Sequence, residues 1–165
     1  MKRQKMIVAL FVAGMLLLGS GLAMAAGSGL PGADGKAVYD YITKTNPYQK
    51  WAFYPGKGKL YEGKHPHGAL LTTYVSADAL KAIEGKAGKF PDGAIIVKEN
   101  YMADKTLDAV TVMYRVKGFD AEAGDWFWAK YSAKGNIDAA GKVGMCSGCH
   151  TAAINNDWVF TGPVK

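Results

Sequence analysis

Alternating apolar and polar positions mark the second half of the chain. From residue 109 to residue 116, valine and tyrosine alternate with threonine, methionine and arginine, which is the period of a half-buried β-strand. Residues 70–75, 94–101 and 125–132 are rich in β-branched and aromatic side chains, which favours three further strands. The pattern therefore predicts at least four strands.

Helical signals lie outside these strands. Apolar residues at helical spacing, preceded by the capping residue Asp34, predict a helix over residues 33–43. Ser76 is expected to cap a short helix that runs through Ile83. Residues 137–153 are rich in alanine and do not alternate, so we expect a helix or helical turn there, and residues 158–160 are compatible with one more short strand.

These elements predict an α+β fold. We expect a β-rich antiparallel sheet of four to five strands, with a few flanking helices at its ends or on one face. Residues 47–68 form a long segment rich in glycine, proline and lysine that also carries several aromatic side chains. A loop of that length in a small domain usually covers a site.

The first 25 residues have the composition of a secretory signal peptide. Lys2, Arg3 and Lys5 precede an apolar stretch from residue 6 to residue 18, and the small-residue sequence 23–25 follows. The apolar stretch is shorter than the about 20 residues that a membrane span needs. We therefore expect export to the periplasm, cleavage after residue 25 and no membrane association afterwards.

The net charge gives no support to nucleic-acid binding. The chain carries 20 basic and 14 acidic residues, and three of the basic ones fall within residues 1–25. The remaining excess of positive charge is small, and the lysines are scattered without a basic stripe or a stacking motif. We expect no nucleic-acid partner.

The two cysteines of the chain lie in the sequence Cys146-Ser147-Gly148-Cys149-His150. Two thiols at this spacing reach the two vinyl groups at one edge of a haem, and the adjacent histidine reaches the iron. This motif is typical of c-type haem attachment, so we expect one covalently attached haem c with His150 as an axial ligand. Export agrees with this prediction, because bacterial c-type haem is attached in the periplasm.

Two other uses of the cysteines are open. A disulfide or a redox dithiol would also use this spacing in an oxidising compartment, although neither requires the following histidine. A zinc site would combine both cysteines with His65 and His67, although structural zinc usually draws on paired, closely spaced ligands.

The other side of the iron has no obvious ligand downstream. Fifteen residues follow His150, and none is methionine or histidine. The upstream candidates are Met102, Met113, Met145, His65 and His67. We expect five-coordinate iron with an open distal site that binds small diatomic or nitrogen-oxide ligands; a methionine or histidine ligand would instead indicate an electron carrier.

Aromatic side chains are candidates for the wall of this site. Phe53 and Phe90 are the first two, together with the aromatic residues of segment 126–128, and ordinary core packing is the alternative for all of them. Arg115 is a candidate partner for a haem propionate, because its guanidinium binds carboxylates well. Its alternative is a surface position on the alternating strand.

Four segments resemble the cytochrome P-460 family and its close relative, cytochrome c-prime-beta. They are His67–Val75 (HGALLTTYV), Phe90–Glu99 (FPDGAIIVKE), Gly124–Tyr131 (GDWFWAKY) and the C-terminal haem motif. The resemblance covers the chain from about residue 51 to residue 160. It implies a β-rich fold and a five-coordinate haem bound through a proximal histidine.

The resemblance also implies a function and a role for Lys98. In P-460 cytochromes a lysine is cross-linked to the haem, and the protein oxidises hydroxylamine or nitric oxide and passes electrons to a redox partner protein. Lys98 is the matching position. In cytochrome c-prime-beta the cross-link is missing, a phenylalanine caps the distal pocket, and the attributed role is nitric oxide binding. From the residues alone, Lys98 and Glu99 would be a solvated pair.

Together these features divide the chain into three parts. Residues 1–25 are the expected signal peptide, residues 26–46 a mobile leader with the first helix, and residues 47–165 a haem domain of the P-460 kind. Exposed strand edges make a homodimer a further expectation.

Overall fold

The computed structural model describes residues 29–165, and the expected signal peptide lies outside them. One seven-stranded sheet has the order β1-β3-β4-β5-β6-β7, with β2 paired beside β1 on the edge of β3, and every pairing is antiparallel. The strands are β1 (Ala52–Phe53), β2 (Tyr61–Glu62), β3 (Leu70–Val75), β4 (Ile95–Tyr101), β5 (Leu107–Arg115), β6 (Trp126–Ser132) and β7 (Ile137–Gly141).

Short helices flank this sheet. The α-helices are α1 (Gly35–Asp40), α2 (Ala77–Glu84) and α3 (Gly144–His150). A π-helical turn, η1 (Tyr41–Thr45), continues α1, and three 3-10 turns complete the set, namely η2 (Tyr48–Lys50), η3 (Ala121–Ala123) and η4 (Thr151–Asn156). None of the helices in residues 29–165 has the length and apolar character that a membrane span requires.

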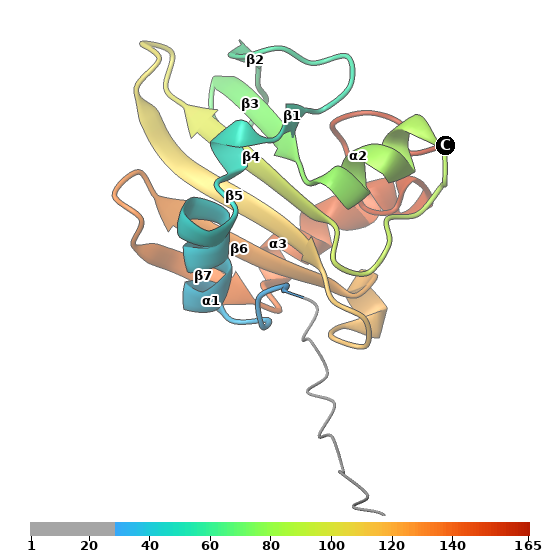
Figure 1. Cartoon of the computed structure of the whole chain (residues 1–165). Helices are drawn as coiled ribbons and strands as arrows, with labels where there is room; N and C mark the ends of the chain where they lie inside the picture. Colours follow the sequence, from blue (N-terminus) through green and yellow to red (C-terminus); the bar gives the residue numbers. More distant parts are fainter. Residues whose placement is uncertain (1–28) are drawn as a thin grey trace, which may run out of the picture.

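The sheet buries both of its faces. Alternate residues of β4 show the division, because Ile95 and Val97 pack under α1 and η1, whereas Ile96 packs on the side of α2 and the C-terminal segment. Figure 1 shows α1 on one face and α3 with the C-terminal segment on the other. We call the second face the α3 face.

The α+β prediction is confirmed, and the sheet is larger than the four to five strands expected. The four predicted main strands are present as β3, β4, β5 and β6. Of the three additional strands, β1 and β2 lie within the predicted loop 47–68, where their few backbone pairs with β3 leave little sequence signal. Asp34 caps α1 as expected, since its Oδ1 accepts from the N–H of Ala37 at 2.9 Å.

The predicted helix over residues 137–153 is wrong in its first part. Residues 137–141 form β7, and the helix begins only at Gly144. The alanines there serve close packing against α1, because a Cβ at Gly35 would lie only 2.7 Å from the Cβ of Ala140. Small residues thus allow a helix to approach the outer strand, and their helix propensity is overridden by pairing with β6.

Two smaller expectations also fail. Residues 158–160 form no strand, since they follow a tight turn at the end of η4. Ser76 stands at the N-cap of α2, but its hydroxyl makes no capping bond and instead accepts from the N–H of Ile95 at 3.0 Å. The serine therefore ties the start of α2 to β4.

Gly35→Val should destabilise the fold by about 1–3 kcal/mol, because overpacking at the α1–β7 contact must push the helix away from Ala140. Urea denaturation followed by circular dichroism measures the change. Gly32→Val is the matched control, since a Cβ at Gly32 meets nothing within 4 Å. Equal stability of the two variants would show that α1 does not depend on this contact.

Candidate functional site

Helix α3 brings the two thiols and His150 together. Cys146 and Cys149 are three residues apart and His150 follows, so the three side chains lie on neighbouring positions of one helical turn. Both cysteines are free thiols; Cys146 is half-buried against the core of the α3 face, whereas Cys149 is exposed. The helix thus holds one thiol against the protein and presents the other to solvent.

The His150 imidazole is buried and its orientation is set by the backbone. Its Nδ1 lies 2.6 Å from the carbonyl oxygen of Trp158. A carbonyl can only accept, so Nδ1 carries the proton and Nε2 keeps its lone pair free. This is the arrangement that metal-binding histidines use, with the second ring nitrogen donating to a fixed acceptor.

A tight turn places the Trp158 carbonyl. Asp157 and Trp158 both have left-handed backbone angles, with φ of 51° and 71°. The Asp157 carboxylate is buried and accepts from Arg115 Nη1 at 3.0 Å and from the N–H of Phe90 at 2.7 Å, while its carbonyl accepts from the Trp126 indole at 3.1 Å. These contacts offset the cost of the unusual backbone.

Residues of the sheet and of one loop lie beside His150 on the α3 face. The ring centres of Trp128 and His150 are 4.7 Å apart, and those of His67 and His150 are 6.3 Å apart and perpendicular. Phe160 packs against His150 from the C-terminal segment at 5.2 Å. Lys98 alternates with Ile96 along β4, so its side chain starts from this same face.

Burial lowers the pKa of the three basic side chains at this site, Lys98, His67 and His150. The pKa of Lys98 falls to about 8 through burial. The pKa of His67 falls to about 4, first through burial and then through the charge of Lys98. Burial also lowers the pKa of His150. Both imidazoles are therefore neutral near pH 7, the protonation state that metal binding requires.

Glu99 faces the opposite side of the sheet from Lys98. Its buried carboxylate accepts from the hydroxyls of Tyr48 at 2.9 Å, Tyr74 at 3.2 Å and Tyr101 at 2.8 Å. Burial and the Glu99 charge raise the pKa of Tyr74 to about 12. Glu99 is thus neither a surface charge nor a partner that orders Lys98.

Comparison of the sequence with known protein families finds a match. The Cytochrome P460 family covers residues 45–161, a range that includes the whole sheet, Lys98 and the Cys146–His150 motif. The chain belongs to the cytochrome P460 family. No curated protein matches the chain closely enough to be compared with it.

Membership in the P460 family makes this a haem cytochrome of the P460 or c-prime-beta kind, and the α3 face fits that cofactor. His150 offers a free Nε2, and both thiols are unpaired. The buried indole N–H of Trp128 has no acceptor among the described residues. A buried donor of this kind is expected where a polar group of a bound cofactor accepts the hydrogen bond. Exposed Met145, Ile154 and Phe160 add apolar surface beside the motif.

The predicted site residues divide between the two faces. Lys98 and Arg115 lie on the α3 face with His150, but Arg115 is buried and already paired with Asp157. Phe90 belongs to the core of that face, where its ring packs on Trp126 at 5.6 Å. Phe53 lies on the other face of the sheet, where its exposed ring packs on Tyr74 at 5.2 Å.

The alternative ligands can also be placed. Met102, Met145 and His65 are exposed, and Met113 is buried in the core of the α3 face. Residues 29–165 contain no group of three or more histidine, cysteine or acidic side chains that could hold a metal ion, so the zinc interpretation gains no support. Of the two upstream histidines, His67 is the one whose ring lies beside His150.

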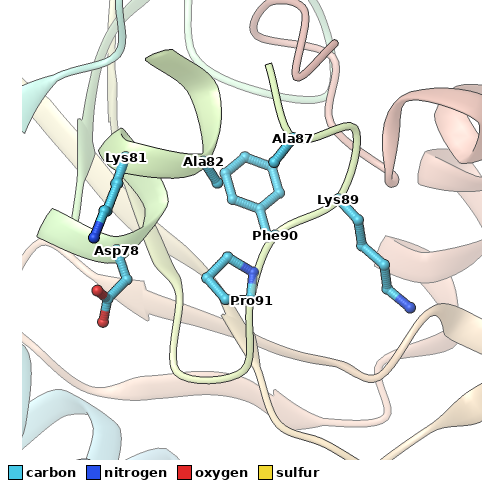
Figure 2. A pocket seen from close by; sticks show the side chains of 7 residues that line it. All are labelled: Asp78, Lys81, Ala82, Ala87, Lys89, Phe90 and Pro91. Atoms are coloured by element: carbon cyan, nitrogen blue, oxygen red, sulfur yellow. The ribbon is translucent and has the colours of Figure 1, made fainter. Parts of the chain in front are cut away.

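A shallow hollow lies at a different place. Figure 2 shows its lining at α2 and the following loop, with the Phe90 ring between Ala82 and Ala87 and the amine of Lys89 directed outwards. None of its lining residues belongs to the haem motif. The hollow is therefore separate from the candidate site.

Sequence reasoning missed three residues that shape the site. Asp157, Trp158 and Asn100 act through a carboxylate, a backbone carbonyl and an amide, and no motif or periodicity marks them. The sequence did mark one neighbour of these residues, His67, because it opens the first segment that resembles the family.

Arg115→Ala should cost about 3–5 kcal/mol of folding free energy, because it leaves the Asp157 carboxylate buried without its partner. Urea denaturation measures the loss. Lys44→Ala, which removes an exposed ion pair with Asp40, is the control and should have no measurable effect. The double variant Arg115→Met/Asp157→Asn should recover part of the loss; a single variant as stable as the control would contradict the importance of this pair.

Proposed function

We propose that the protein is an exported c-type cytochrome with one covalently attached haem, which binds small nitrogen-oxide ligands on the side of the iron opposite His150. The observation that carries the proposal is the α3 turn, where two free thiols precede a histidine whose Nδ1 is held by the Trp158 carbonyl. Family membership supplies the cofactor class.

The residues of α3 are suited to hold the haem covalently. Each thiol of Cys146 and Cys149 adds across one vinyl group, so that a C–S bond forms and the thiol proton passes to the neighbouring vinyl carbon. No oxidant and no leaving group are needed. His150 then supplies a neutral nitrogen to the iron from the adjacent position of the same helix.

We propose that a cross-link between Lys98 and the haem determines whether the protein oxidises its ligand. Its amine lies on the α3 face, and its pKa of about 8 keeps a sizeable neutral, nucleophilic fraction near neutral pH. A cross-link to a haem ring carbon replaces an N–H and a C–H by an N–C bond, so its formation is an oxidation that needs oxygen or a peroxide. With the cross-link, we propose oxidation of hydroxylamine or nitric oxide.

Oxidation of a ligand implies one further partner. With haem bound, oxidation of the ligand would release electrons, so a redox partner protein must accept them. A periplasmic location follows from the proposed signal peptide. We further propose that no nucleic acid or membrane is involved, and a homodimer through the strand edges remains a proposal.

A second candidate function is simple electron transfer. The position of His67 beside His150 favours it, because two axial imidazoles are typical of electron-carrying haems. The non-catalytic nitric oxide carrier of the c-prime-beta type is the outcome expected if Lys98 is free.

Mass spectrometry under denaturing conditions should find one haem retained on the purified protein. Cys146→Ala and Cys149→Ala should each keep the haem through one remaining thioether, and the double variant should lose it because no C–S bond can form. Ser147→Ala, between the two cysteines, is the control and should retain the haem fully. Release of the haem from the unmodified protein by acid extraction would contradict covalent attachment.

Lys98→Arg should abolish a red-shifted ferrous absorption band and most hydroxylamine oxidation, because arginine keeps the charge but cannot form the cross-link. Tryptic peptides of the unmodified protein should show Lys98 joined to the haem. Lys130→Arg is the control, since Lys130 lies in the same cross-strand row two strands away. A free Lys98 together with an ordinary c-type spectrum would contradict the proposed oxidation and favour nitric oxide binding without turnover.

A further inference from the structure

His67 and His150 lie at the spacing of two ligands of one metal ion. Their ring centres are 6.3 Å apart and their planes are perpendicular. An imidazole nitrogen binds a first-row metal at about 2.0–2.1 Å, and the ring centre is about 1.2 Å further away, so two imidazoles on opposite sides are about 6–6.5 Å apart. The observed separation matches this value.

The hydrogen bonds of Asn100 assign the free nitrogen of His67. The amide nitrogen of Asn100 donates towards the carbonyls of Lys98 at 3.0 Å and Ala109 at 3.2 Å, which fixes the orientation of the amide. The Asn100 Oδ1 therefore faces the His67 Nδ1 at 2.9 Å, and Nδ1 must be the donor. The lone pair of His67 is on Nε2, as in His150.

The loop that carries His67 is fixed against β4. The N–H of Gly63 donates to the carbonyl of Ala69 at 2.8 Å, which closes the loop. A Cβ at Gly68 would lie 2.5 Å from the backbone N and O of Tyr101, so only glycine lets the loop approach the strand this closely. His67 is therefore held beside the end of β4 by its backbone and by Asn100.

We propose that His67 is the second axial ligand of the haem iron in the ligand-free protein, with Asn100 as its positioning residue, and that a nitrogen-oxide ligand binds by displacing it. The proposal rests on the proposed function, since it takes His150 as the first ligand. It replaces the sequence-based expectation of five-coordinate iron in the resting state. His65, two residues away but exposed, has no such place.

The optical and electron paramagnetic resonance spectra of the ferric protein test this proposal. The unmodified protein should be low-spin and six-coordinate, and His67→Ala should convert most of it to a high-spin form. Added imidazole should restore the low-spin spectrum by occupying the position that the His67 side chain has left. His65→Ala is the matched control and should leave the spectrum unchanged.

Two further measurements sharpen the test. Cyanide should bind His67→Ala at least about tenfold more tightly than the unmodified protein, because no internal ligand competes for the iron. Asn100→Leu removes the acceptor for Nδ1, so it should shift the reduction potential and raise the high-spin fraction, whereas Asn100→Asp should keep the low-spin form.

A high-spin spectrum of the unmodified protein that His67→Ala leaves unchanged would overturn the proposal. In that case a spectrum that still changes in His150→Ala would leave the proposed function standing. If His150→Ala leaves the haem spectrum unchanged, the proposed function itself fails. The two failures are therefore distinguishable.

Discussion

The buried ion pair between Arg115 and Asp157 joins the C-terminal segment to the sheet. Arg115 is the last residue of β5, and Asp157 starts the turn whose next carbonyl orients His150. The guanidinium also lies over the Trp126 ring at 5.1 Å, which places the pair within the tightly packed core of the α3 face. The orientation of the His150 imidazole thus depends on a charge pair at the end of β5.

Two adjacent residues of β4, Lys98 and Glu99, point to opposite faces of the sheet and differ in their hydrogen-bond partners. The carboxylate of Glu99 is satisfied by three tyrosine hydroxyls on the α1 side of the sheet, whereas Lys98 has no carboxylate partner among the described residues. A buried charge that is fully hydrogen-bonded is stable, and a buried amine without a partner is shifted towards its neutral form. The side-chain alternation of one strand therefore makes one residue structural and leaves its neighbour reactive.

The structural features that depend on short-range sequence patterns could be predicted. Alternation identified β5, and the spacing of Cys146, Cys149 and His150 marked three residues that α3 brings together. Features that depend on distant partners were missed. The alanines of β7 resemble a helix until Gly35 is seen beside them, and Phe53 resembles a pocket residue until its register with Tyr74 turns it to the other face. Asn100 and Asp157 have no local signal, because their partners lie far away in sequence.

The acceptor for the His150 imidazole is a backbone carbonyl rather than a carboxylate. Any residue at position 158 would supply this main-chain oxygen, but its placement depends on the left-handed backbone of both Asp157 and Trp158. Position 157 carries a further constraint, because its side chain must also pair with the buried Arg115. The side chain that fixes the His150 acceptor, that of Asp157, therefore belongs to the residue before the one that supplies the carbonyl oxygen.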